Sequence, residues 1–144
     1  MKNKFRNANA AYEYLHDKII REGIDFANTK ALFNVGFYIT DPMDNKIINR
    51  ERSWKPEYAE AEWKWYLSED NSIGKLGEIY GTIPQIWYKM ADAAGKVNSN
   101  YGWQWGRNNQ IDYIVDLLKN NKDTRQAAIS IYDAKEHDCY SKDT

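Results

Sequence analysis

Segments with a helical period alternate with segments of strand-like composition, and this alternation most limits the folds open to the chain. Apolar residues at helical spacing predict a helix over 8–22 that ends at Gly23. Residues 30–40 and 126–132 are rich in β-branched and apolar residues, and each predicts a strand. A chain that mixes helices and strands in this way belongs to the α/β or α+β class.

Further helices are predicted in the middle of the chain. A helix starts at Pro56 and runs to Leu67, glycines within 74–81 mark a flexible connection, and a second helix opens at Pro84 and stops at Gly95. Apolar residues at positions 111–118 define an amphipathic helix. No internal repeat and no Pro/Gly/Ser-rich linker interrupts this pattern, so residues 1–144 are expected to form a single unit.

Composition excludes several classes of function. Hydrophobic residues make up 42% and charged residues 28%, a balance typical of globular proteins. Twenty basic residues against twenty-one acidic ones give a net charge of −1, and DNA binding is not expected without a basic excess. No run of about 18 apolar residues is present, so no membrane span is expected. Cys139 is the single cysteine, which excludes an intrachain disulfide and favours the cytoplasm.

A carboxylate within an aromatic stripe is the first candidate for chemistry. On the predicted helix 56–67, Tyr58, Glu62, Trp65 and Tyr66 fall on one face at i, i+4, i+7 and i+8. A carboxyl that is partly desolvated in this way can relay protons near neutral pH. The alternative is a solvated glutamate on a charged helix, and the pattern alone favours that alternative.

Two other places could bind a ligand. Residues 98–105 are dense in Asn, Tyr and Trp, and could line a pocket in which a planar ring stacks while Asn side chains hydrogen-bond to it. The plainer interpretation is a turn whose aromatics enter a core. Arg125, between a predicted helix and a strand, could bind phosphate or be a surface charge. His16 and His137 lack metal-ligand spacing, so no metal site is expected.

Five segments, taken in order, resemble the thymidylate synthase family. They are Glu62–Leu67 (EWKWYL), Pro84–Trp87 (PQIW), Asn100–Trp105 (NYGWQW), Asn109–Ile111 (NQI) and Asp123–Gln126 (DTRQ). Within the family, the segment from Asn98 to Trp103 is most similar to phage deoxycytidylate hydroxymethylases. Other stretches are closer to ordinary thymidylate synthases. A phage-type member, located in the host cytoplasm, is therefore expected.

The resemblance implies a fold, a reaction and ligands. The fold would be the N-terminal portion of a thymidylate synthase-like domain, a twisted sheet with helices packed on one face. The reaction would transfer a methyl or hydroxymethyl group to C5 of dUMP or dCMP from 5,10-methylenetetrahydrofolate. The resemblance does not distinguish the two nucleotides, or methyl from hydroxymethyl transfer.

The resemblance also assigns roles to individual residues. Glu62 would organise proton transfer through water, and Tyr101 would assist proton removal from C5. Trp87 would lie against the folate. Arg125 would reach across a dimer to the partner's nucleotide phosphate, and Asn100 would bind the substrate.

Departures from the family pattern lead to further expectations. Gln126 stands where a second arginine is usual, and Gly106 replaces another arginine, with Arg107 one position later. Cys139 comes too early to be the nucleophile, which is expected shortly after the last residue. The chain is therefore expected to be inactive alone and to pair with a complementary C-terminal half or a homodimer partner.

Two alternative functions remain open. The chain could be a non-catalytic remnant that binds a nucleotide or partner, or it could be an unrelated α/β binding domain.

Overall fold

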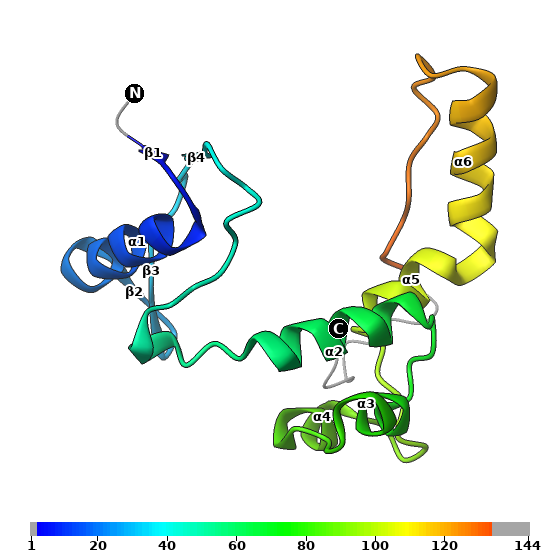
Figure 1. Ribbon diagram of the computed structural model, residues 1–144, viewed down its shortest axis with the longest axis horizontal. Helices are drawn as coiled ribbons and strands as arrows, with labels where there is room; N and C mark the ends of the chain where they lie inside the picture. The colour runs from blue at the N-terminus through cyan, green and yellow to red at the C-terminus, as the bar shows by residue number, and fades with distance from the viewer. Residues whose placement is uncertain (1–2, 134–144) are drawn as a thin grey trace. The chain divides into compact units, whose positions relative to one another are not determined.

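The computed structural model describes residues 3–133, and its contacts divide the chain into two compact units (Figure 1). The first unit is Met1–Pro56 and the second is Glu57–Thr144. The expectation that the chain is a single domain stays a prediction. Helices and small sheets together confirm the predicted α/β class. No helix in the described part of the chain is long and apolar enough to cross a membrane.

The first unit is built on α1 (Ala8–Glu22), which has the predicted bounds. The Asn7 side chain accepts a hydrogen bond from the backbone N–H of Ala10 at 2.9 Å and so caps the first turn. At the other end, the N–H of Gly23 donates to the carbonyl oxygen of Ile19 at 2.9 Å. A Cβ at Gly23 would collide with that same oxygen, so the helix ends at a residue without a side chain.

The single strand predicted over 30–40 is wrong, because its two ends pair with different partners. β3 (Thr29–Ala31) pairs antiparallel with β2 (Ile24–Phe26), and β4 (Tyr38–Ile39) pairs parallel with β1 (Lys4–Phe5). Between them the backbone turns at Asn34, whose φ of 55° is left-handed and incompatible with an extended strand. The two pairs form separate two-stranded sheets, the only sheets among the described residues.

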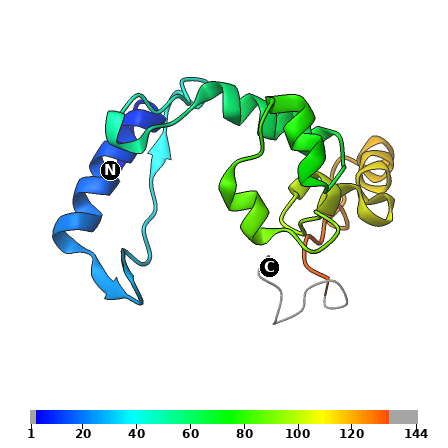
Figure 2. The same cartoon turned by 90° about the horizontal axis from the view of Figure 1, so that it is seen from below.

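The second unit is helical and surrounds a small core. Its helices are α2 (Pro56–Leu67), α3 (Ile73–Tyr80), α4 (Gln85–Met90), α5 (Tyr101–Gly106) and α6 (Gln110–Asn120). The 3₁₀ turn η2 (Arg107–Asn109) lies between α5 and α6. A second 3₁₀ turn, η1 (Arg50–Arg52), belongs to the first unit. Figures 1 and 2 show α3 and α5 beside α2. The buried apolar residues are Ala61, Trp65, Ile73, Leu76 and Val97. The predicted helices 56–67 and 111–118 are confirmed.

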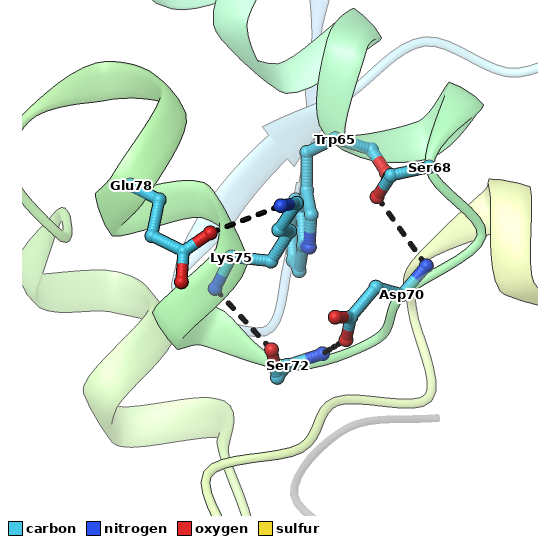
Figure 3. A network of polar contacts seen from close by, with 6 residues as sticks. All are labelled: Trp65, Ser68, Asp70, Ser72, Lys75 and Glu78. Atoms are coloured by element: carbon cyan, nitrogen blue, oxygen red, sulfur yellow. Dashed lines mark hydrogen bonds and ion pairs between the residues drawn. The ribbon is translucent and has the colours of Figure 1, made fainter.

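The flexible connection predicted over 74–81 is wrong, because most of it is α3. Figure 3 shows how the helix starts. The Asp70 carboxylate accepts from the N–H of Ser72 at 2.8 Å, and the Ser72 hydroxyl accepts from the N–H of Lys75 at 3.2 Å. Gly77 is needed for packing, since a Cβ there would lie 2.9 Å from Cγ1 of Ile83. Capping and packing therefore outweigh the low helix propensity of glycine.

The helix from Pro84 ends at Met90, five residues before the predicted stop at Gly95. The Asp92 carboxylate accepts hydrogen bonds from the N–H groups of Ala94 and Lys96, both at 2.8 Å. An aspartate that bonds its following backbone in this way favours a turn over a helix.

The strand predicted over 126–132 is also wrong, since the structure assigns no strand there. The Gln110 side chain takes the place of a neighbouring strand: its Oε1 accepts from the N–H of Ser130 at 2.9 Å, and its Nε2 donates to the carbonyl oxygen of Ser130 at 3.2 Å. A ladder needs a second backbone, and the groups that bond to this segment from α6 and η2 are side chains, those of Gln110 and Arg107.

Candidate active site on helix α2

Glu62 lies half-buried in the middle of α2, with a tyrosine one helical turn away on each side. The Tyr58 hydroxyl donates a hydrogen bond to Oε1 of Glu62 at 2.9 Å. Tyr66, at i+4, lies on the other side of Glu62, close enough for the negative charge of Glu62 to contribute to the raised pKa of its hydroxyl. The i±4 spacing of the helix thus places two phenols on one carboxylate. The side chain is not the fully solvated glutamate that the pattern alone favoured.

Trp87, on α4, joins this arrangement. Its indole Nε1 donates to the Tyr58 hydroxyl oxygen at 2.7 Å. Its ring meets Trp65 edge-on, with 5.1 Å between ring centroids. A chain of hydrogen bonds therefore runs from Trp87 through Tyr58 to Glu62, and it connects two of the residues singled out from the sequence.

The two phenols that contact Glu62 hold their protons strongly. Burial raises the pKa of Tyr58 to about 12, with a further contribution from the negative charge of Glu62. Burial also raises the pKa of Tyr66, and the negative charge of Glu62 makes a second, smaller contribution in the same direction. Both hydroxyls are therefore protonated donors at neutral pH, and Glu62 is the group between them that can accept a proton.

Tyr101 extends the cluster towards α5. Its ring meets Tyr66 edge-on, with centroids 5.5 Å apart, and lies parallel to Trp105 at 6.5 Å. About half of the Tyr101 side chain is exposed. Glu62, Trp87 and Tyr101 thus border one continuous group of aromatic side chains, as a shared site requires.

Asn100 is fully buried and holds the start of α5. Its side-chain oxygen accepts from the N–H of Trp103 at 2.8 Å, and its side-chain nitrogen donates to the carbonyl oxygen of Asp70 at 3.3 Å. Gly102 allows the backbone of α5 to approach that of α2 closely, because a Cβ at this position would collide with the backbone of Tyr66. These contacts fix α5, and with it Tyr101, against α2. The plainer interpretation of 98–105 as a turn applies only to Asn98 and Ser99, because α5 begins at Tyr101.

Arg125 lies apart from this cluster. It is exposed in the turn after α6, and no hydrogen bond or ion pair between described residues involves its guanidinium. His137 and Cys139 lie outside the described residues. His16 stacks on Tyr12 in the first unit, with centroids 5.5 Å apart. No group of three or more His, Cys, Asp or Glu side chains within 3–133 could hold a metal ion.

Sequence reasoning missed two features of this region. The first is the bridging role of Tyr58, although its place in the stripe with Glu62 was visible. The second is Arg107, whose guanidinium carbon lies 5.3 Å from the centre of the Trp103 ring and whose Nη2 donates to the carbonyl oxygen of Ile131 at 3.3 Å. That role depends on a contact 24 residues along the chain, which no local pattern indicates.

Comparison with known proteins finds relatives that are named deoxycytidylate 5-hydroxymethyltransferase or thymidylate synthase. A deoxycytidylate 5-hydroxymethyltransferase of Enterobacteria phage T4 is 38% identical over 79 residues, which cover 53% of this chain and 30% of that protein. A thymidylate synthase of Bacillus subtilis subsp. natto is 26% identical over 106 residues, covering 66% and 36% respectively. The chain therefore spans about a third of the length of these curated relatives.

The family model described as thymidylate synthase matches residues 11–141, which is most of the chain and includes the whole Glu62 cluster. On that match, the chain belongs to the thymidylate synthase family.

Proposed function

We propose that the chain is part of a pyrimidine deoxynucleotide one-carbon transferase that acts at C5 of dUMP or dCMP. The observation that carries this proposal is the hydrogen-bonded chain from Trp87 through Tyr58 to Glu62, with Tyr101 attached through its ring contact to Tyr66. It supplies a carboxylate between protonated phenols, next to an aromatic surface. Proton transfer at a pyrimidine ring needs such a group, and a planar ligand needs such a surface.

In this proposal, Glu62 moves protons to and from the pyrimidine through water, and Tyr101 assists removal of the proton from C5. Tyr101 is about half exposed, which suits a residue that must meet a substrate. Arg125, being exposed and free of ion pairs with other described residues, suits a phosphate of a nucleotide held by a partner subunit. Asn100 contributes to substrate binding by fixing the start of the helix that carries Tyr101.

The one-carbon donor would be 5,10-methylenetetrahydrofolate, which supplies the carbon unit and, for methyl transfer, the reducing hydride. Trp87 fits this ligand in a specific way. Its N–H is already bonded to Tyr58, so what it offers a pterin ring is its aromatic face rather than a hydrogen bond.

The nucleophile of the reaction is proposed to come from a complementary segment rather than from Cys139. The residues that follow Cys139 do not resemble the family's Cys-His surroundings. The chain alone would then be inactive, and it would act in the cytoplasm with a complementary C-terminal half or a homodimer partner. The same partner would cover α6, whose apolar residues Ile111, Val115 and Leu118 are each about 40% exposed.

The experiment combines the chain with the proposed complementary C-terminal half and measures tritium release from C5 of labelled dUMP and dCMP. Glu62→Gln keeps the shape of the side chain but removes the titrating proton, so kcat should fall by about 10²–10⁴-fold with little change in KM. Glu60→Gln, an exposed glutamate on the same helix, is the matched control and should keep the wild-type rate. Equal rates for all three proteins would refute the assignment of Glu62.

Arg125→Ala tests the phosphate contact in the same assay. Loss of one charge-assisted hydrogen bond should weaken nucleotide binding by about 1.5–3 kcal/mol and chiefly raise the nucleotide KM. Lys122→Ala removes an exposed charge three residues earlier in the same loop, and its KM should stay close to wild type.

The second candidate function, a non-catalytic module that binds a nucleotide or a partner, is favoured by the exposed apolar face of α6. It predicts nucleotide binding or complex formation with no tritium release under any condition. Tritium release from the reconstituted protein would exclude it.

A further inference from the structure

The Tyr58 hydroxyl uses both of its hydrogen-bonding functions between two residues of the candidate site. It accepts from Nε1 of Trp87 at 2.7 Å and donates to Oε1 of Glu62 at 2.9 Å. Trp87 lies 29 residues further along the chain, on α4, while Tyr58 and Glu62 share α2. The hydroxyl is therefore a direct polar link between these two helices.

The direction of both hydrogen bonds is forced by chemistry. An indole nitrogen can only donate, so the Tyr58 oxygen must be the acceptor of that bond. The single hydroxyl hydrogen is then left for Glu62, whose carboxylate can only accept. The ring itself is held separately, because it packs edge-on against Tyr80 with centroids 5.3 Å apart.

Charge on Glu62 strengthens this whole chain. A hydrogen bond to a carboxylate is stronger than one to a neutral group, and a hydroxyl that donates strongly becomes a better acceptor. Loss of the negative charge on Glu62 should therefore weaken the bond between Trp87 and Tyr58, although Trp87 does not hydrogen-bond to Glu62. The phenols that face Glu62 are Tyr58 and Tyr66, and these in turn interact with Tyr80 and Tyr101.

We propose that Tyr58 is a positioning residue that couples the charge of Glu62 to the strength of the hydrogen bond that fixes the Trp87 indole. This inference rests on the proposed function. The position of the aromatic surface offered to the folate would then depend on whether Glu62 carries a proton. One hydroxyl would then connect the proton-transfer group with the cofactor contact.

The test follows the indole N–H of Trp87 by nuclear magnetic resonance in the full chain with isotope-labelled tryptophan. Trp87→Phe identifies its signal. In the wild type, the signal should move as acid protonates Glu62, and Glu62→Gln should show the acid position at neutral pH. In Tyr58→Phe the signal should no longer follow Glu62, and its hydrogen exchange should be about 2–10-fold faster, as expected for one lost hydrogen bond.

Tyr80→Phe is the control that separates the hydroxyl of Tyr58 from the packing of its ring. It alters the neighbouring phenol but leaves the bonded hydroxyl in place, so the Trp87 signal should still respond to Glu62. A response that persists in Tyr58→Phe, or that is lost equally in both variants, overturns the proposal. If Tyr58→Phe does not fold, an unchanged Trp87 signal in Glu62→Gln overturns it instead.

The same spectra keep this proposal distinct from the proposed function. Addition of dUMP, dCMP or 5,10-methylenetetrahydrofolate to the reconstituted protein should shift the Trp87 signal only if the functional assignment is right. A response of Trp87 to Glu62 without any shift on ligand addition would support the coupling and refute the function.

Discussion

The two units of the chain differ in how much they bury. In the second unit five apolar residues form a core, and the Trp65 side chain has no exposed surface. In the described part of the first unit, Ala11 is the only buried apolar residue, and Phe26 and Phe33 contact each other while each stays nearly 60% exposed. Because burial of apolar surface is the main driving force of folding, the second unit is the better stabilised of the two.

This difference explains where the candidate site lies. Glu62, Trp87 and Tyr101 all belong to the second unit, and the helices that carry them pack on the Trp65 core. A site needs side chains whose positions are locked by packing, and only that unit supplies such packing among the described residues. The first unit, with its exposed aromatics, is the region where a covering partner would add most stability.

Removal of a core side chain should produce the largest contrast between the units. Trp65→Ala leaves a cavity at the centre of the second unit and should reduce the free energy of unfolding by about 3–5 kcal/mol. Phe26→Ala removes a mostly exposed ring from the first unit and should cost about 0.5 kcal/mol. Urea unfolding followed by circular dichroism measures both. Equal losses would show that the first unit has a core as important as the second.

Two glycine substitutions should act in opposite directions. A Cβ at Gly102 would lie 2.7 Å from Cα of Tyr66 and still closer to its carbonyl group, so Gly102→Ala should force α5 from α2 and cost about 1–3 kcal/mol. A Cβ at Gly36, in the first unit, would meet nothing within 4 Å. Gly36→Ala should therefore stabilise by about 0.4–1 kcal/mol through the unfolded state. The melting temperature should therefore fall in Gly102→Ala and rise in Gly36→Ala. A lower melting temperature in both variants would contradict this difference between the units.

The smallest effect concerns alkaline pH. The pKa of Tyr58 rises from 10.0 to about 12 in the folded state, so between these values the unfolded chain releases a proton that the folded chain keeps. The contribution to stability is complete below pH 10 and is lost as pH rises through about 12. Tyr58→Phe should make this part of the stability curve less steep, while Tyr66, whose pKa is also raised by burial, continues to contribute. A curve unchanged by Tyr58→Phe would show that this phenol is not the group responsible.

Helices were predictable where their signals are local. The bounds of α1 and α2 match the prediction, because caps, proline starts and apolar spacing lie within a few residues of each helix end. α3 was missed because its two internal glycines resemble a linker, while the contacts that favour helix include Ile83, beyond its end. The strand over 30–40 failed for a similar reason: pairing with residues 4–5 and 24–26 decides which parts of it are strand.

The candidate site likewise has parts that the sequence predicts and parts that depend on tertiary contacts. Its place on α2 could be predicted, because Tyr58, Glu62 and Tyr66 recur at the period of the helix. The contact of Tyr101 with Tyr66 could not, since it depends on a glycine that allows two helix backbones to approach closely. Arg107 shows the same limit, because its partners on α5 and in the following extended segment are brought together only by folding.

The sequence by itself determined the class of the fold, the helix that carries Glu62 and the family resemblance, because each depends on residue types at short, regular spacing. Only the tertiary structure decided that Trp87 reaches Glu62 through the hydroxyl of Tyr58. That decision requires α4 to pack against α2, and the packing depends on a core drawn from residues 61 to 97. Hydrogen bonds between helices form wherever burial brings the donors and acceptors together, and a pattern within one helix does not contain that information.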